Sequence, residues 1–168
     1  LENPGWYTSY TPYQPEVAQG RLEMLLNFQQ MIIDFTGMDI ANASLLDEGT
    51  AAAEAMGLCN RLDKMDKKIV FISVDCHPQT IEVIKTRAEP LGLKVIIGND
   101  NELSNLSEDI ICGILQYPGT LGDIKDPSEN ISKIKKKNGK AILVCDLLSL
   151  AKLKTCLLYT SDAADDSL

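Results

Sequence analysis

A few residues of this chain stand where an α/β fold places ligand-binding groups. Gly49 and Thr50 open an alanine-rich run, and His77 and Asp146 each follow a β-branched apolar run. Backbone N–H groups at the start of a helix bind phosphate and other anions. In parallel sheets, ligands bind beyond the carboxyl ends of the strands. This pattern is compatible with a small acidic or zwitterionic ligand between a helix N-terminus and the ends of two strands.

Each of these positions also has a structural interpretation, and the sequence leaves both open. Asp47 is a typical N-cap residue that would occupy the N–H groups a phosphate needs, and with Glu48 it brings two carboxylates to the same place. His77 precedes Pro78, so it is expected to be extended at the start of a helix, in a capping or turn role. Asp146 is equally able to cap the segment that follows it.

Two helices are predicted in the first 62 residues. Leucine and isoleucine recur at helical spacing between positions 22 and 33, and Gly37 supplies a stop signal, which predicts a helix over about 17–36. Asp47 precedes a run of high helix propensity, which predicts a second helix over about 47–62. The alanines of this second helix, which Gly49 opens, also allow close packing against a sheet, which is the alternative to phosphate binding.

Four short apolar runs predict the strands. Residues 69–74 have the composition of a strand buried on both faces. The other predicted elements are strands at 94–97, 110–115 and 141–145, helices at 80–88 and 127–138, and a Pro/Gly turn at 117–122. Because strands and helices alternate, the strands are expected to be parallel. The predicted fold class is α/β, with an incomplete, mostly parallel sheet flanked by helices.

The composition restricts the partners of the chain. Its 168 residues are 45% hydrophobic and carry a formal net charge of -8. That charge argues against nucleic acid, because phosphate backbones are bound by clustered Lys and Arg. The basic run at 133–140 is interleaved with isoleucines and is interpreted as the solvated face of an amphipathic helix. No apolar run approaches the roughly 20 residues of a membrane helix, so we expect a soluble protein without a membrane partner.

The cysteines indicate neither a metal site nor a disulfide framework. They are odd in number, widely spaced and free of any C-x-x-C pair. We expect buried thiols in a reducing compartment. The five positions are Cys59, Cys76, Cys112, Cys145 and Cys156.

Five blocks, in order, carry a resemblance to a known family. The blocks are Glu2-Asn-Pro-Gly-Trp-Tyr-Thr-Ser-Tyr-Thr-Pro-Tyr-Gln-Pro-Glu16, Asn42-Ala-Ser-Leu-Leu-Asp-Glu-Gly-Thr-Ala-Ala-Ala-Glu54, Asp75-Cys-His-Pro-Gln-Thr80, Gln116-Tyr-Pro-Gly119 and Cys145-Asp-Leu-Leu-Ser-Leu150. Together they resemble the amino-terminal half of the glycine-cleavage P-protein, the pyridoxal-phosphate (PLP) glycine decarboxylase. The resemblance implies that residues 1–155 are a fragment of the large domain of a fold-type-I PLP-dependent transferase.

The last 13 residues do not continue this pattern. Residues 156–168 resemble a translated sequencing adapter and show no hydrophobic period, so we expect a non-native tail. An in-frame tail in the source DNA would contradict this expectation.

The resemblance implies a function for the complete protein. Glycine loses its carboxyl group as CO2, and its aminomethyl group passes to the lipoyl arm of a carrier, the H-protein. The PLP lysine is expected in the half of the family chain that is absent here, so Gly49, Thr50, His77 and Asp146 are interpreted as a degenerate copy of a PLP site. No PLP is expected on this fragment, which is expected to be inactive alone.

An aromatic segment near the start of the chain has two interpretations. By resemblance, it reaches the active-site region formed with the cofactor-bearing half, where Tyr10, Thr11 or Tyr13 would contact glycine or PLP. The alternative is ordinary packing between the two halves. The sequence leaves both interpretations open.

Two other functions compete with the first. One is a non-catalytic structural subunit that partners a separate PLP-bearing chain, and the other is a different fold-type-I PLP enzyme, such as an aminotransferase or lyase. The expected partners are the cofactor-bearing half, the H-protein and glycine, in an oligomer. The expected location is the bacterial cytoplasm, or the mitochondrial matrix if the host is a eukaryote.

Overall fold

The computed structural model of the protein describes residues 14, 16 and 18–152. It divides into two compact units, Leu1–Ser44 and Leu45–Leu168, which are described separately. The tail predicted to be non-native, 156–168, lies outside the described residues.

The first unit contains one long helix, α1 (Gln19–Thr36). Its C-terminus is the one predicted: Gly37 adopts a left-handed conformation with φ 71°, and its N–H donates to the carbonyl of Ile33. A left-handed residue after the last turn is the usual way in which a helix ends at glycine. No residue of α1 is buried, so its apolar side chains form no core within the described chain.

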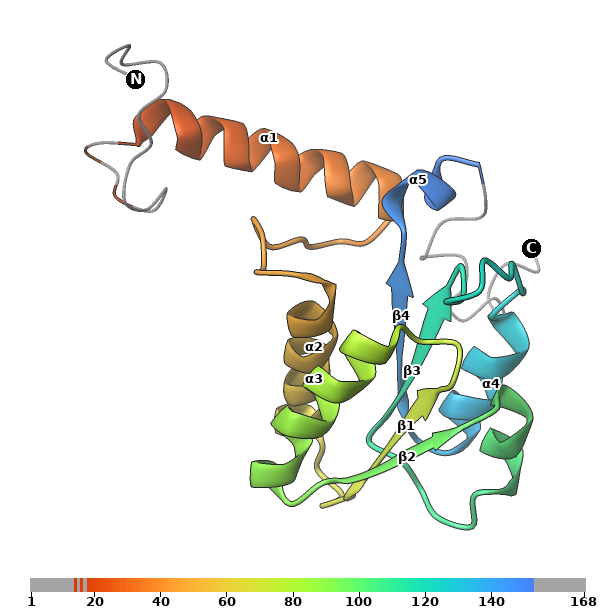
Figure 1. Cartoon of the computed structure of the whole chain (residues 1–168). Coiled ribbons are helices and arrows are strands. Elements are labelled where there is room, and N and C mark those ends of the chain that lie inside the picture. The colour runs from red at the N-terminus through yellow and green to blue at the C-terminus, as the bar shows by residue number, and fades with distance from the viewer. Residues whose placement is uncertain (1–13, 15, 17, 153–168) are drawn as a thin grey trace, which may run out of the picture. The chain divides into compact units, whose positions relative to one another are not determined.

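The second unit is a four-stranded sheet with helices on both faces (Figure 1). All pairs are parallel and the strand order is β2-β1-β3-β4, as expected from the alternation of strands and helices. The elements are α2 (Glu48–Leu62), β1 (Ile69–Ser73), α3 (Pro78–Ala88), η2 (Glu89–Leu91), β2 (Lys94–Gly98), η3 (Asp100–Asn105), β3 (Cys112–Tyr117), α4 (Ser128–Lys136), β4 (Lys140–Cys145) and α5 (Leu147–Leu150).

The central strand β1 explains the two layers of helices. Its alternate residues point to opposite faces, and all five are buried. Val70 and Ile72 belong to one apolar cluster with residues of α2 and α3. Phe71 belongs to the other cluster, with residues of η3 and α4. The prediction of a strand buried on both faces is therefore confirmed.

The predicted strand at 110–115 is wrong by two residues. Ile110 and Ile111 are buried but precede β3, which begins at Cys112 and continues through Gln116 and Tyr117. The last two residues pair with Val144 and Cys145 of β4. Apolar residues mark burial, whereas the ladder is set by pairing with neighbouring strands. The sequence pattern therefore located the core correctly and the strand ends incorrectly.

Smaller differences concern helix ends. The helix predicted at 80–88 begins at Pro78, the first-turn position that proline favours. The helix predicted at 127–138 is α4, which ends at Lys136 because Asn138 adopts a positive φ of 53°. Its isoleucines, Ile131 and Ile134, are buried, as the amphipathic interpretation requires. Neither η3 nor α5 was predicted.

The structure also describes the state of the cysteines and the character of the helices. The four described cysteines form no disulfide. In the part of the chain that the structure describes, no helix combines the length and apolarity needed to cross a bilayer.

Candidate functional site

The carboxyl ends of the strands bring two of the predicted site residues to one edge of the sheet. β1 and β4 flank β3, so the segments that follow these three strands lie together (Figure 1). The N–H of Thr120 donates to the carbonyl of Asp75 at 2.8 Å, and the N–H of Asp146 donates to that of Tyr117 at 3.2 Å. His77 and Asp146 therefore both lie at the edge where α/β sheets bind ligands.

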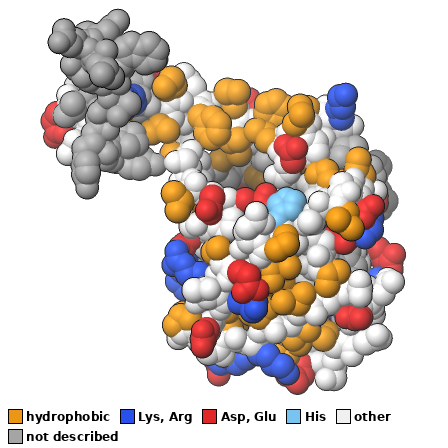
Figure 2. Space-filling view, in the orientation of Figure 1, with side chains coloured by type: hydrophobic (Ala, Val, Ile, Leu, Met, Phe, Trp, Pro, Cys, Tyr) orange, Lys and Arg blue, Asp and Glu red, His pale blue; other side chains and the backbone are white. Residues whose placement is uncertain are grey.

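His77 links the ends of β1 and β3. It is extended, with φ -61° and ψ 138°, at the N-cap position of α3. Its Nδ1 lies 2.8 Å from Oγ1 of Thr120, and its Nε2 lies 3.9 Å from a carboxylate oxygen of Glu48. The ring makes no side-chain cap, so the turn interpretation fits and the capping one does not. The side chain is 40% exposed, and Figure 2 shows the histidine at the surface.

The N-terminus of α2 already carries two carboxylates. Asp47 accepts a hydrogen bond from the Thr50 N–H at 2.7 Å. Hydrogen bonds from the backbone and then the side chain of Thr50 hold the pKa of Asp47 below its usual value. Glu48 accepts a hydrogen bond from Oγ1 of Thr80 at 3.0 Å. Asp47 is therefore the N-cap of α2, as the sequence indicated. The Thr50 N–H group, which a phosphate at this helix start would use, already donates a hydrogen bond to Asp47.

Gly49 packs against a neighbouring helix. A Cβ at this position would lie 3.3 Å from Cγ2 of Val83 and 3.6 Å from Cα of Thr80, both in α3. The residue is buried. Close packing of this helix was the alternative that the sequence offered, and it is present: Gly49 meets α3, while Ala52 and Ala53 of α2 lie in one core cluster with residues of the sheet. Only a residue without a side chain permits this approach without displacing Val83.

Asp146 caps the short helix α5. Its carboxylate accepts a hydrogen bond from the N–H of Leu148 at 2.9 Å. Its backbone is extended, with φ -74° and ψ 123°. Asp146 therefore has the capping role that the sequence offered as an alternative, and it lies at the same sheet edge as His77.

A second polar cluster, absent from the predictions, lies beside the first. Lys125 Nζ is 2.7 Å from a carboxylate oxygen of Asp75. Both residues line a cavity of about 10 Å³, together with Ser73, Gln116 and Asn130 among others. Among the buried side-chain N and O atoms of the described residues, Oε1 of Gln116 alone has no hydrogen-bond partner. The cavity has room for one water molecule, which buried polar groups commonly bind.

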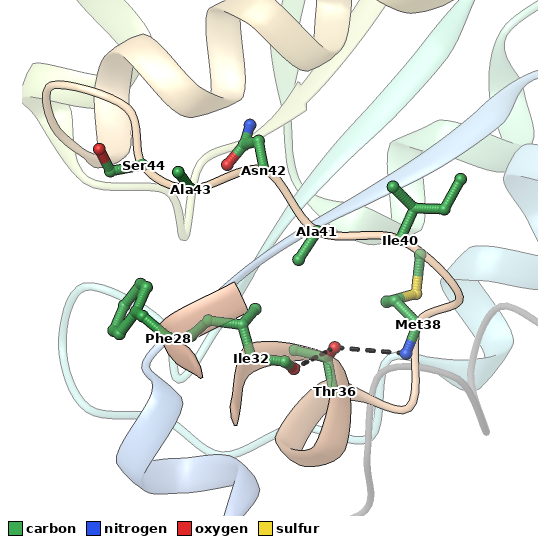
Figure 3. A pocket seen from close by; sticks show the side chains of 9 residues that line it. All are labelled: Phe28, Ile32, Thr36, Met38, Ile40, Ala41, Asn42, Ala43 and Ser44. Atoms are coloured by element: carbon green, nitrogen blue, oxygen red, sulfur yellow. Dashed lines mark hydrogen bonds between the residues drawn. The ribbon is translucent and has the colours of Figure 1, made fainter. Parts of the chain in front are cut away.

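The first unit has a pocket of its own. Residues 38–44 run back along α1 and enclose about 400 Å³ (Figure 3). Gln29 Nε2 donates to the carbonyl of Ala41 at 2.7 Å, which holds this segment to the helix. Thr36 Oγ1 donates to the carbonyl of Ile32 at 2.7 Å. The lining, which we call the α1 groove, consists of Phe28, Ile32, Thr36, Met38, Ile40, Ala41, Asn42, Ala43 and Ser44.

Three predicted site residues, Tyr10, Thr11 and Tyr13, lie outside the described residues. The remaining four are placed at two neighbouring locations: Gly49 and Thr50 at the start of α2, and His77 and Asp146 at the strand ends. Within the described ranges, no group of three His, Cys, Asp or Glu side chains is arranged to hold a metal ion.

The sequence analysis missed the pair Asp75 and Lys125. Its signal was weak, because it consists only of a polar residue just after β1 and a lysine in a loop.

Sequence comparison with known proteins points to one family. Residues 1–165 match the family model described as glycine cleavage system P-protein. Over 155 residues the chain is 80% identical to a glycine dehydrogenase (decarboxylating) of Pelagibacter ubique, which covers 92% of this chain. The chain spans 16% of that relative's length.

Solved structures support the same fold. A crystal structure of glycine decarboxylase (P-protein) of the glycine cleavage system, in inhibitor-bound form, superposes with a TM-score of 0.80 at 32% identity, covering 92% of this chain and 36% of that one. A C-DES mutant with glycine covalently linked to the PLP cofactor gives 0.61 at 12% identity, covering 90% and 43%. The parallel sheet with flanking helices is that of fold-type-I PLP-dependent enzymes, and the chain belongs to the glycine cleavage system P-protein family.

Proposed function

We propose that this chain is one part of a glycine decarboxylase of the glycine cleavage system. The observation that carries the proposal is the 80% identity over 155 residues to a glycine dehydrogenase (decarboxylating). The complete enzyme releases the glycine carboxyl as CO2 and passes the aminomethyl group to the lipoyl arm of the H-protein. When bound, PLP supplies the electron sink for this chemistry. Glycine and the H-protein are therefore its proposed substrate and carrier.

PLP itself, in this proposal, is held by the cofactor-bearing half of the enzyme and not by this chain. The Asp47 and Glu48 carboxylates at the start of α2 support this, because they occupy the place of a phosphate and repel a dianion. Lys125, which lines a cavity with Ser73 and Gln116 at the strand ends, is engaged in an ion pair with Asp75. A Schiff base needs an uncharged amine. These contacts of the described residues support the proposal that PLP is bound elsewhere in the enzyme.

The four candidate positions then serve the architecture. Gly49 allows α2 to pack on α3, Thr50 receives the cap from Asp47, and His77 joins two loops. Asp146 starts α5. We propose that they are the remains of a PLP site whose groups now hold the strand ends in place. The proposal for Tyr10, Thr11 and Tyr13 is that they approach glycine or the cofactor in the complete enzyme.

The α1 groove is the proposed contact with the cofactor-bearing half. Phe28, Met31 and Ile40 are exposed apolar side chains of this unit, and no residue of α1 is buried. An exposed apolar surface of this kind marks an interface. The occupant we propose is the rest of the P-protein, because this chain spans 16% of its relative's length.

A PLP trapping experiment tests the assignment of the cofactor. The chain and a full-length P-protein are incubated with PLP, reduced with borohydride and digested, and the labelled peptides are identified by mass spectrometry. We expect label on the full-length protein outside this segment and none on the chain. A reduced PLP adduct on a lysine of this chain would overturn the proposal for the cofactor and leave the family unaffected.

A second assay tests the activity. Exchange of 13CO2 with glycine, in the presence of H-protein, is expected to be absent with this chain and present with full-length protein that contains it. Exchange by the chain alone would contradict the proposed division of labour. No exchange by the full-length protein would contradict the proposed reaction.

A second candidate function is a non-catalytic subunit that pairs with a separate PLP-bearing chain. One observation favours it: the aligned stretch is 36% of the solved P-protein chain but 16% of the Pelagibacter ubique protein, so the solved chain is less than half as long. The gene that encodes this segment distinguishes the two, because a subunit stops after the amino-terminal half. The proposed location, from bacterial relatives, is the cytoplasm.

A further inference from the structure

A polar pocket lies beside the end of β1, on the face of the sheet that α4 and η3 cover. Helices α2 and α3 cover the other face, so the pocket is separate from the start of α2 (Figure 1). Its volume is about 230 Å³. The lining residues are Val74, Asp75, Asn99, Asn101, Lys125, Asp126, Glu129, Asn130 and Lys133. Only Val74 is apolar, so a ligand in this pocket would be held by polar contacts.

Two ion pairs bring both signs of charge into the pocket. Lys125 Nζ lies 2.7 Å from a carboxylate oxygen of Asp75, and Lys133 Nζ lies 2.8 Å from a carboxylate oxygen of Glu129. Asp126 adds a third carboxylate to the lining. A simple anion or cation would meet a like charge beside each opposite one. A zwitterion can place each of its two groups against a charge of opposite sign.

The inner side of the pocket leads to a buried acceptor. Asp75, Lys125 and Asn130 line both this pocket and the cavity of about 10 Å³ that has room for one water molecule. Gln116 lines that inner cavity, and its Oε1 is the buried side-chain atom of the described residues that has no hydrogen-bond partner. A buried acceptor without a donor is unfavourable. The inner side therefore favours a ligand that brings an N–H group, directly or through one water molecule.

The size of the pocket restricts the ligand further. Pockets for drug-sized ligands measure about 300–1,000 Å³, and one water molecule occupies about 30 Å³ in the liquid. The volume of about 230 Å³ therefore suits a molecule of about five to ten non-hydrogen atoms. The smaller α-amino acids have this size and carry an ammonium group and a carboxylate two bonds apart on one carbon.

We propose that this pocket binds a small α-amino acid with an uncharged side chain, as its zwitterion. The ammonium group faces Asp75 and reaches Oε1 of Gln116 through one water molecule, and the carboxylate accepts hydrogen bonds from Lys133. The Glu129 side chain is 81% exposed, so it can turn into solvent and leave Lys133 to the ligand. The inference does not depend on the proposed function, because it rests on the charges and the volume of this pocket alone.

The test titrates the 168-residue chain at pH 7 with glycine, L-serine and L-asparagine, followed by calorimetry and by NMR of the backbone amides. We expect at least one of these probes to bind with a dissociation constant of about 0.1–5 mM and to shift the amides of Asn101 and Lys133. Acetate and methylammonium each carry one of the two charges, and both are expected to bind at least about tenfold more weakly.

Three results of this titration would overturn the proposal. The first is that none of the three amino acids saturates the chain below about 20 mM. The second is that acetate or methylammonium binds as tightly as the amino acids. The third is that the shifted amides lie at the start of α2 and not around the pocket.

Four variants separate binding from stability. Lys133→Gln is expected to weaken the binding of the probe by about fivefold or more, whereas Glu129→Gln, which breaks the same ion pair, is expected to bind it at least as tightly as the unchanged chain. Lys136→Gln, an exposed lysine of the same helix that does not line the pocket, is the control and is expected to change nothing. Asn101→Trp keeps every charge, but its exposed side chain fills the pocket, so binding is expected to be lost. Equal weakening by Lys133→Gln and Glu129→Gln, or full binding by Asn101→Trp, would contradict the proposal.

Discussion

The carboxylate of Asp47 lies 2.7 Å from the backbone nitrogen of Thr50 and accepts its hydrogen bond. This one contact caps α2 and, at the same time, places a negative charge at a helix start, where free N–H groups would otherwise favour an anion. The start of the helix is thus stabilised by the chain itself.

Asp47 is expected to stabilise the fold in a pH-dependent way. The pKa of its carboxyl is lowered in the folded protein, so its contribution is present above the unfolded-state pKa and is lost as pH falls through the folded-state value. Asp47→Ala is expected to lower the free energy of unfolding at pH 7 and to have little effect near pH 3. Urea titrations at pH 7, 5 and 3 measure this. Asp47→Ser, which keeps a hydrogen-bond acceptor without the charge, is the control. If the loss of unfolding free energy in Asp47→Ala is the same at all three pH values, the prediction is wrong.

Gly49 is expected to tolerate no side chain while Val83 is opposite. A Cβ there would lie 3.3 Å from Val83 Cγ2, so Gly49→Val is expected to cost about 1–3 kcal/mol by overpacking. The double variant Gly49→Val/Val83→Ala is expected to recover most of the loss beyond that of Val83→Ala alone. Thermal and urea unfolding of the four proteins form the cycle. Additive losses would show that Gly49 has another role.

Gly113 is expected to be required for the approach of α4 to the sheet. A Cβ at Gly113 would lie 2.5 Å from Cδ1 of Ile134, and Gly113→Ala is expected to lower stability by about 1–3 kcal/mol. Gly57→Ala, inside α2 with only Arg61 Nη1 at 3.5 Å, is the matched control. It is expected to raise stability by about 0.5–1 kcal/mol, because alanine favours helix. The prediction is wrong if both changes act in the same direction.

The contact between His77 and Thr120 is expected to stabilise the loops after β1 and β3. His77→Ala and Thr120→Val are each expected to lower stability by about 0.5–1.5 kcal/mol. The double variant is expected to lose no more than the larger single loss, because both changes remove one hydrogen bond. In full-length enzyme, His77→Ala is expected to leave glycine–CO2 exchange within about twofold. Loss of exchange with unchanged stability would assign His77 a part in the chemistry.

Ile40 is expected to lie in the contact with the cofactor-bearing half. It lines the α1 groove and is 84% exposed, so Ile40→Asp is expected to weaken association with that half by about tenfold or more without lowering the stability of this chain. Ile124→Asp, at an exposed apolar residue of the second unit, 63% exposed, is the control. Calorimetry or co-purification measures the difference. Equal binding by both variants would remove the groove from the interface.

Local signals were sufficient for much of the fold. The apolar runs and the helical spacing of the leucines located α1, α2 and the four strands, and Gly37 and Asp47 marked helix ends correctly. These features depend on neighbours within a few residues, through backbone conformation and capping. The alternation of elements then implied parallel strands, which the observed pairing confirms.

Other features needed contacts between distant residues. The strand end at Tyr117 depends on pairing with Cys145, and the need for glycine at position 49 depends on Val83. No sequence signal joins Asp75 to Lys125, whose side chains form an ion pair.

The sequence by itself determined where the four strands and the longer helices lie, to within a few residues, and which family the chain resembles, because both depend on residue types and their spacing. Only the tertiary structure decided which side chains meet at the start of α2 and at the strand ends. Those contacts arise from packing between elements, and packing is set by the whole chain.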